Sequence, residues 1–238
     1  MTAVIWHDIE CGAYAEDLGL WRSLADEHGD PILDIGAGTG RVSLDLARHG
    51  HRVTALELDG ELLDELARRA GGLPLQTTRA DARTFELGAR FPLCIVPMQT
   101  IQLLGGRDGR LAFLRSVRRH LEPGGRLAIA IAEMLDLYEV LDGMPAPLPD
   151  IRELDGVVYS SQPTAVRATG GQFVLERRRD IVTARGERTS EHNAIELDRL
   201  SAGALEQEGR EAHLRPAGRL EISATHDYVG STVVMFDA

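Results

Sequence analysis

Apolar and polar positions follow two different periods along the first half of the chain. Short apolar runs, which are typical of buried strands, alternate with segments in which apolar residues recur every three or four positions, which are typical of amphipathic helices. The expected strands are residues 32–35, 52–57, 75–78, 93–96 and 126–132, and the expected helices are residues 1–30, 39–49, 60–70 and 107–121. This alternation predicts an α/β fold, in which a parallel sheet with right-handed crossovers has helices on both faces.

The pattern changes after residue 144, where prolines at positions 145, 147 and 149 predict a linker. Strand-like runs follow at residues 157–166, 173–183 and 187–197, and Gly170-Gly171 and Arg185-Gly186 between them are typical of hairpin turns. Ser201 can cap a helix that runs to about residue 212, and residues 219–225 and 231–236 predict a closing hairpin. We therefore expect an N-terminal helical lid (1–30), a core (31–150), an antiparallel β insertion that covers the substrate (151–200), and a C-terminal helix and hairpin of the core (201–238).

Composition narrows the class of protein. The chain has 238 residues, of which 43% are apolar, so one large domain or one domain carrying a subdomain is expected. No apolar run approaches the roughly 20 residues of a membrane span, and residues 1–30 have no signal-peptide pattern. Cys11 and Cys94 are too few and too far apart for a zinc site or a disulfide framework. A cytoplasmic protein without a membrane partner is the expectation.

The charge balance bears on the substrate. The formal net charge is −11, and every basic residue other than histidine is an arginine. An acidic surface repels phosphates, which disfavours a nucleic-acid partner. The locally basic run at residues 177–179 is flanked by Glu176 and Asp180, so it is read as a solvated strand face. These features favour a small-molecule substrate.

Three alternate glycines, Gly36, Gly38 and Gly40, connect the first strand to the next helix, with Asp34 two residues upstream. Such a turn is typical of nucleotide-like ligands, because glycine allows a sharp turn and brings bare N–H groups close to the ligand. The dinucleotide fingerprint G-x-G-x-x-G would need glycine where Arg41 stands. A nicotinamide-dependent dehydrogenase is therefore disfavoured.

Glu57 ends the second expected strand, 17 residues after Gly40. An acid at this position of such a layout accepts hydrogen bonds from both ribose hydroxyls of the ligand. The alternative is an ordinary exposed strand-end acid, and Asp59 becomes the candidate if the strand ends two residues later. We expect Glu57 to be the ribose ligand.

The Asp34–Gly40 turn resembles motif I of the class I S-adenosylmethionine (SAM) dependent methyltransferases. The run from Leu121 to Leu127 (LEPGGRL) matches a turn signature common in this family. The resemblance implies a Rossmann-like, seven-stranded, mostly parallel sheet whose last strand is antiparallel. It implies SAM as cofactor and S-adenosylhomocysteine (SAH) as product. It also implies that Asp81 accepts from the adenine amino group beside the Ala82 backbone, although a strand-end Asp alone is usually a turn or helix cap.

Two residues near the turn have open interpretations. The resemblance implies that an aromatic side chain such as Tyr14 folds over the methionine end of the cofactor, where a sulfonium favours an aromatic face. Packing within a helix is the alternative for Tyr14, and more so for Trp21. Arg41 meets the cofactor carboxylate or is a surface helix residue. The expected cofactor-binding residues are Tyr14, Asp34, Gly36, Ala37, Gly38, Gly40, Arg41, Glu57, Leu58, Asp81, Ala82, Pro97 and Met98.

The segment after the fourth strand, residues 97–102 (PMQTIQ), lies at the edge where ligands bind. It lacks the Asn/Asp-Pro-Pro-Tyr sequence of enzymes that methylate DNA bases or glutamine, and no acidic cluster near it resembles the metal site of catechol-type enzymes. No metal is expected. Gln99 contacts cofactor or substrate, or simply begins a helix.

Candidate catalytic residues are His192, His226 and Tyr228, the last two in a His-Asp-Tyr run around Asp227. A histidine can take a proton from an attacking O–H or N–H group, although a surface or packing histidine is the alternative for each. A base is needed only if the acceptor loses its proton as it attacks.

The predicted function is methyl transfer from SAM to a nitrogen or oxygen of a small-molecule metabolite. The insertion and the tail resemble those of sugar-amine and glycine N-methyltransferases. A homodimer is compatible with the sequence. The alternative is a methyltransferase-fold protein that binds SAM but acts as a non-methylating cyclase or isomerase, or as a cofactor-binding module.

Overall fold

The computed structural model describes residues 2–141, 146–226 and 228–238. The chain forms two compact units, a larger one of residues 14–133 and 200–238 and a smaller one of residues 1–13 and 134–199. Both units differ in their bounds from the expected segments. Residues 1–30 are divided between them, and the second segment of the smaller unit begins at Met134, where residue 151 was expected to begin the insertion.

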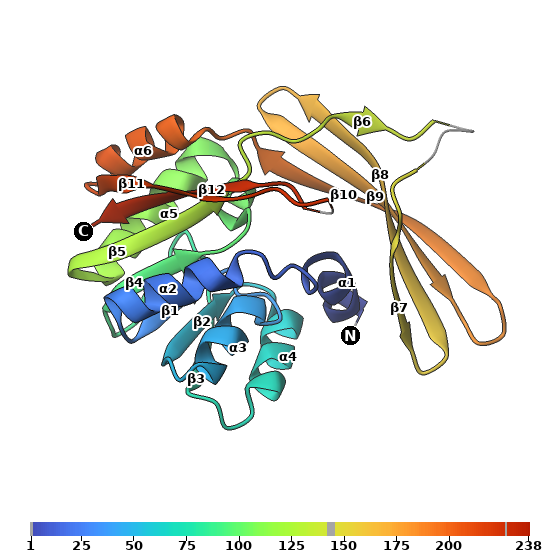
Figure 1. Ribbon diagram of the computed structural model, residues 1–238, viewed down its shortest axis with the longest axis horizontal. Coiled ribbons are helices and arrows are strands. Elements are labelled where there is room, and N and C mark those ends of the chain that lie inside the picture. Colours follow the sequence, from blue (N-terminus) through green and yellow to red (C-terminus); the bar gives the residue numbers. More distant parts are fainter. Residues whose placement is uncertain (1, 142–145, 227) are drawn as a thin grey trace. The chain divides into compact units, whose positions relative to one another are not determined.

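The larger unit contains a seven-stranded sheet in the order β11-β12-β5-β4-β1-β2-β3 (Figure 1). Strands β1 to β5 are parallel, and β12 pairs with β5 in the antiparallel sense, so the predicted fold class is confirmed. The strands are β1 (Ile32–Ile35), β2 (Val53–Glu57), β3 (Leu75–Arg79), β4 (Phe91–Val96), β5 (Leu121–Ile131), β11 (Arg215–Ile222) and β12 (Ser231–Asp237). The helices are α2 (Leu18–His28), α3 (Arg41–Arg48), α4 (Gly60–Ala70), the 3₁₀ helix η1 (Thr100–Leu103), α5 (Gly106–His120) and α6 (Ala202–Glu211).

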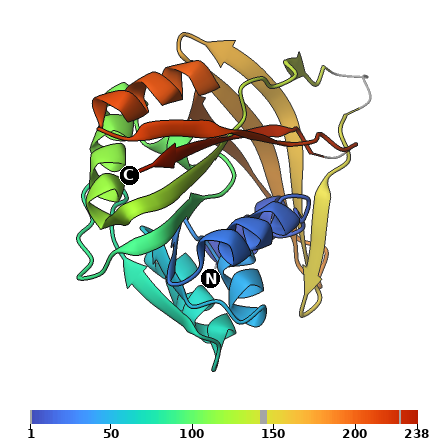
Figure 2. The same cartoon turned by 60° about the vertical axis from the view of Figure 1, so that its left-hand side comes forward.

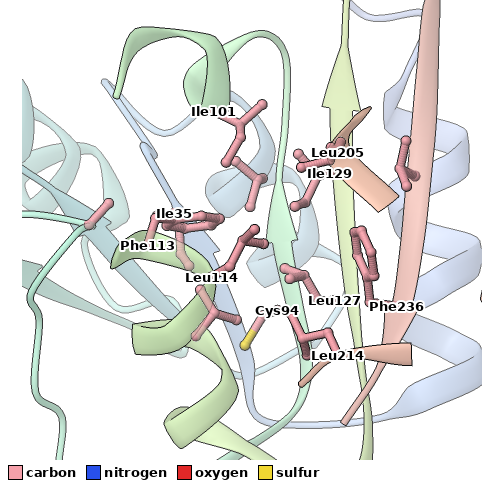
Figure 3. Close-up of a cluster of buried hydrophobic side chains, with 14 of the residues drawn as sticks. Ile35, Cys94, Ile101, Phe113, Leu114, Leu127, Ile129, Leu205, Leu214 and Phe236 are labelled. Carbon is pink, nitrogen blue, oxygen red and sulfur yellow. The ribbon is translucent and has the colours of Figure 1, made fainter. Parts of the chain in front are cut away.

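Apolar side chains fill both faces of this sheet, because alternate residues of a strand point to opposite faces. On one face, Ile35, Cys94 and Ile129 pack against α5 and α6, and Figure 3 shows Phe113, Leu114 and Leu205 of those helices among them. On the other face, Ile32, Ile95 and Ala130 pack against α2 and α3. The strand ends between these two layers are the part of the sheet that remains available for a ligand.

One strand begins earlier than expected. β5 starts at Leu121, which pairs with Phe91, and pairing resumes with Arg126 opposite Leu93. The predicted turn therefore lies inside the strand as a bulge of four residues, where Gly124 has φ +77° and a Cβ on Gly125 would meet the Phe91 carbonyl oxygen at 2.9 Å. The glycines allow the reversal, and the bulge keeps the strand paired on both sides of it.

The smaller unit is an antiparallel sheet in the order β10-β9-β8-β6, with β7 paired to β8 (Figure 2). Its strands are β6 (Tyr138–Glu139), β7 (Asp150–Leu154), β8 (Val157–Thr169), β9 (Gln172–Val182) and β10 (Arg188–Asp198). The two predicted hairpins are present. β7 was not predicted, because its sequence DIREL shows no apolar alternation. Pro145 of the expected linker lies outside the described residues.

Helix α1 (Thr2–Cys11) packs in the smaller unit rather than continuing into α2. The Arg179 guanidinium donates to both Glu10 oxygens at 2.8 Å and lies over the Trp6 ring. Trp6 also meets Tyr159 edge to face. Helix α1 ends at Cys11, and the Gly12 N–H donates to the Asp8 carbonyl at 3.0 Å in a conformation in which a Cβ would meet that oxygen at 2.5 Å. The expected helical segment at residues 1–30 therefore consists of two helices, α1 and α2.

Candidate functional site

The glycine turn leaves β1 at Ile35 with a backbone that only glycine adopts easily. Gly36, Gly38 and Gly40 have φ values of +75°, +55° and +94°. A Cβ on Gly36 would lie 2.4 Å from Thr100 Cγ2, and one on Gly40 would lie 2.1 Å from Leu66 Cδ1. The turn therefore packs closely against η1 and α4. At Gly36 and Gly40, both the backbone conformation and the lack of space exclude a side chain.

The N–H groups of this turn are not bare, which corrects the expectation. Gly36 and Ala37 donate to the Leu56 carbonyl at 2.8 and 3.1 Å, and Gly40 donates to the Ala37 carbonyl at 2.9 Å. Gly38 donates to Glu57 Oε2 at 2.9 Å. A phosphate cradle needs several N–H groups aimed at the ligand, so these four do not make one. The turn fits a ligand that approaches the backbone without phosphates.

Glu57 ends β2 and holds the turn from the opposite side. Its Oε1 accepts from the backbone N–H groups of Leu58 at 2.8 Å and Asp59 at 2.9 Å. Asp59 is not the strand-end acid, because its side chain caps α4 by accepting from Glu61 and Leu62. A carboxylate offers about four lone-pair positions, and three are used here, so Oε2 retains capacity for a hydroxyl donor.

Asp34 lies under the turn and is completely buried. Ser43 Oγ donates to its Oδ2 at 2.5 Å, while Oδ1 has no hydrogen-bond partner among the described residues. Burial raises the pKa of Asp34 to about 6, although the Ser43 hydrogen bond opposes the shift. An unpartnered buried carboxylate oxygen is costly, so it marks a position where a ligand or water donor would be stabilised.

Asp81 and its neighbours follow β3. Arg83 donates to the Asp81 carboxylate from its backbone and from its guanidinium, and these contacts lower the pKa of Asp81. These are the contacts of a turn cap, which was the alternative interpretation of Asp81. The role of Asp81 as an acceptor for the adenine amino group stays a prediction. Ala82 is buried in the core, whereas Leu58, beside Glu57, is 57% exposed. An exposed leucine next to the expected ribose ligand is suited to contact an apolar ring.

The segment after β4 is strained and firmly held. Met98 has φ +55°, which is uncommon for a residue with a side chain. Gln99 precedes η1, and its carbonyl accepts from the Gln102 N–H at 2.8 Å, so the helix-start alternative matches its backbone role. The buried Gln102 amide exchanges two hydrogen bonds with the backbone of Ala132. No local pattern indicates this contact, because Gln102 and Ala132 are 30 residues apart along the chain.

Arg41 is neither a free cation nor a surface residue. It donates to both oxygens of the fully buried Asp17, at 2.5 and 2.8 Å, and to the Tyr14 carbonyl at 3.0 Å. Trp21 Nε1 donates to the same carboxylate at 2.8 Å. The Tyr14 ring, outside either helix, meets the Tyr228 ring at 4.9 Å. The sequence analysis did not identify Asp17 as a partner of Arg41, because no local pattern links residues that are 24 positions apart.

The candidate catalytic residues are divided between the units. His192 is exposed on β10 of the smaller unit. His226 is exposed in the β11–β12 connection of the larger unit, where Tyr228 is partly buried, and Asp227 lies outside the described residues. Because His192 and His226 belong to different units, the catalytic roles of the three residues stay predictions.

Two properties of the described residues bear on other functions. No group of three or more His, Cys, Asp or Glu side chains among them could hold a metal ion. None of their helices is both long and apolar enough to cross a membrane.

Comparison with known proteins gives matches to the part of the chain that contains the glycine turn. The methyltransferase domain family matches residues 32–125, which contain the turn, Glu57, Asp81 and strand β4. The chain is 32% identical over 127 residues to the cypemycin N-terminal methyltransferase of a Streptomyces species, covering 52% of each protein. It is 33% identical over 141 residues to the S-adenosyl-L-methionine-dependent Diels-Alderase iccD of Talaromyces variabilis, covering 51% of this chain and 48% of that one. The chain thus spans about half the length of these curated relatives.

The same fold occurs in the sugar N-methyltransferase KedS8 of Streptoalloteichus sp ATCC 53650. The two structures agree with a TM-score of 0.75 over 98% of this chain and 92% of the other, at 18% sequence identity. At that identity the likeness shows the fold. Residues 32–125 are thus similar to the methyltransferase domain family, and the chain shares the fold of KedS8.

Proposed function

We propose that this protein transfers the methyl group of SAM to a nitrogen, or else an oxygen, of a small-molecule metabolite. The observation that carries the proposal is the site at the end of β1 and β2. It combines a glycine turn without a phosphate cradle, a strand-end carboxylate and a buried acid with an unpartnered oxygen. Those features suit an adenosine ligand that has a ribose diol and a charged amino-acid part but no phosphate.

Each group has a proposed task toward the cofactor. Glu57 Oε2 accepts from a ribose hydroxyl, and Leu58 lies against the adenine ring. Asp81 accepts from the adenine amino group, which requires it to share its carboxylate with Arg83. Gly36, Gly38 and Gly40 let the ligand approach the backbone. When bound, SAM supplies an activated methyl group, so alignment and exclusion of water account for much of the expected acceleration.

The acceptor class follows from chemistry and from the relatives. An amine attacks as its free base and needs no strong base in the protein, which agrees with the scattered histidines. KedS8 is named a sugar N-methyltransferase, and the cypemycin enzyme is named an N-terminal methyltransferase, so we rank nitrogen before oxygen. The acidic surface, with a net charge of −11, disfavours a nucleic-acid acceptor. His192, His226 and Tyr228 stay proposals for residues that contact the acceptor.

A second function is favoured by one observation. A relative of similar identity is named a SAM-dependent Diels-Alderase, so the family contains a protein named for ring formation. A non-methylating cyclase or isomerase built on this chain would form product without releasing SAH. Methyl transfer releases one SAH for each product molecule, which separates the two functions.

Calorimetric titration of the protein with SAM and SAH, with NADH as a control, tests the cofactor proposal first. We expect micromolar dissociation constants for SAM and SAH and no heat from NADH. SAM-binding protein is then incubated with amine and alcohol metabolites, and SAH release is measured. NADH binding without SAM binding would contradict the proposal, and product formation without SAH would establish the second function instead.

A further inference from the structure

A buried cluster of polar side chains lies beside the glycine turn. Asp17, at the start of α2, is fully buried and receives three donors, two from the Arg41 guanidinium and one from the Trp21 indole. The Arg41 side chain is only 11% exposed and also donates to the Tyr14 carbonyl. The cluster therefore joins the first residue of α3, which directly follows Gly40, to the segment that enters α2.

The same arginine holds the Tyr14 ring as well as its backbone. The Arg41 guanidinium carbon lies 4.9 Å from the centre of the Tyr14 ring. Tyr14 packs on Tyr228, and both side chains belong to an apolar cluster that includes Met98, the residue that follows β4 and Pro97. Burial and the nearby Asp17 carboxylate raise the pKa of Tyr14 to about 12, so its hydroxyl stays protonated. The two tyrosines therefore form an aromatic pair close to the residues after β4, and the Tyr14 hydroxyl in this pair is neutral.

These contacts bear on the expected roles of Arg41 and Tyr14. A guanidinium that is bidentate to a buried carboxylate is neutralised, so Arg41 has little free charge for a cofactor carboxylate. Its position instead fixes where Tyr14 lies relative to Gly40. Tyr14 is also the first residue of the larger unit. The chain that follows α1 thus enters the larger unit at Tyr14, whose carbonyl accepts a hydrogen bond from Arg41.

We propose that Arg41 and Asp17 are a positioning pair, which fixes Tyr14 and Tyr228 against the methionine end of bound SAM. This proposal rests on the proposed function. Neither residue of the pair is expected to touch the cofactor, and both act through the Tyr14 segment.

The first test replaces Arg41 with lysine. Lysine keeps the charge, but its single ammonium cannot donate in the forked geometry to both Asp17 oxygens and to the Tyr14 carbonyl. We expect the SAM dissociation constant of Arg41→Lys, measured by calorimetry, to rise at least about tenfold. Arg22→Lys is the matched control. Arg22 also forms a bidentate pair, with Asp45 at 2.7 and 3.0 Å, and also joins α2 to α3, so its SAM affinity is expected to stay within about twofold.

A double-mutant cycle separates positioning from direct contact. Tyr14→Ala keeps the buried ion pair and is expected to weaken SAM binding as much as Arg41→Lys, whereas Tyr14→Phe keeps the ring and binds within about threefold of wild type. If Arg41 acts through Tyr14, the double variant binds no more weakly than Tyr14→Ala alone. Additive losses would overturn the positioning role, because they would indicate a direct contact from Arg41.

The outcomes also separate the two proposals. Wild-type protein that binds SAM, together with a folded Arg41→Lys variant of equal affinity, overturns the positioning pair and leaves the proposed function intact. Wild-type protein that binds no SAM overturns both. Thermal melting midpoints of Arg41→Lys and Arg22→Lys are measured alongside, and equal losses of stability with unequal losses of affinity support the positioning role.

Discussion

The glycine-turn end of the parallel sheet and the antiparallel sheet of the smaller unit use charge in opposite ways. At the glycine turn, Asp17 and Asp34 are deeply buried and Glu57 is half-buried. On β9, three consecutive arginines each meet an acidic partner. Arg177 pairs with Asp150, Arg178 with Asp180, and Arg179 with Glu10.

The difference teaches which forces specify each region. Strands β1 and β4 are held by apolar burial, so a charge placed there is costly and is kept only where it has a task. Strands β8 and β9 carry half-buried polar side chains, and their charges are paired within the smaller unit, as Arg178 is with Asp180 and Arg179 with Glu10 of α1. We therefore expect substitutions at the turn to change ligand binding, and substitutions of paired charges in the antiparallel sheet to change local stability alone.

The largest effect on SAM binding is expected from Gly38→Val, and Gly170→Val is its matched control. Gly38 has φ +55° in the glycine turn, and Gly170 has φ +58° in the β8–β9 hairpin, so valine meets nearly the same backbone strain at both positions. That strain costs about 1–2 kcal/mol for a residue with a side chain. Only at position 38 would the side chain also occupy the space of the ligand.

Calorimetry and thermal melting are measured on both glycine variants. We expect both to lose stability, and only Gly38→Val to lose SAM binding, by more than about a hundredfold, or roughly 2.7 kcal/mol. Wild-type affinity in a folded Gly38→Val protein would mean that the turn is not the cofactor site, and the distinction between the two regions would then fail.

Asp34→Asn sharpens the comparison, because it separates stability from binding. Burial raises the pKa of Asp34 to about 6, so the folded protein holds this proton more tightly than the unfolded chain. The associated stability is present below the ordinary pKa near 4 and is lost as the pH rises through about 6. A shift from 3.8 to about 6 corresponds to at most about 3 kcal/mol.

Asparagine carries no charge at any pH, so we expect Asp34→Asn to melt at a higher temperature than wild type at pH 8 and at a similar temperature at pH 4.5. SAM binding at pH 8 is expected to weaken at least about tenfold, since an ionised acceptor is lost. Melting curves at the two pH values, with calorimetry at pH 8, measure both effects. A variant that is less stable at pH 8 but binds SAM normally would contradict the assigned role.

The sequence predicted the parallel sheet well because its signals are local. Strand β4 is a continuous apolar run, and β1 is interrupted only by Asp34. Helix α4 was placed at its observed bounds, where Asp59 caps its start and Gly71 follows its end. The hairpins of the smaller unit were found from Gly170 and Gly186 for the same reason. Glu57, at the end of β2, was identified by its spacing from the glycine turn.

Contacts between distant residues left no such signal. The Asp17–Arg41 pair joins residues 24 apart, and the Glu10–Arg179 pair that holds α1 in the smaller unit joins residues 169 apart. A hydrophobic period continues through residues 1–30 whether or not the chain turns at Gly12, so the division of that segment could not be read from it. The same limit applies to Gln102, whose buried amide finds its partner only in the folded sheet.

The smallest effect is expected from Asp180→Asn in the smaller unit. Burial alone would raise the pKa of Asp180, but hydrogen bonds from Arg188 and Ser190 and the charge of Arg178 lower it below its ordinary value. A lowered pKa means that the stability is present above pH 4 and is lost as the pH falls through the folded-state pKa. Because Arg188 and Arg178 are 55% and 40% exposed, solvent screens both pairs, and we expect a cost of only about 1 kcal/mol at pH 7.

Hydrogen exchange should quicken in β9 and β10 at pH 7 while the SAM dissociation constant stays within about twofold. A loss of SAM affinity comparable to that of Asp34→Asn would show that the paired charges of this sheet also serve the cofactor site, and the contrast between the two regions would no longer hold.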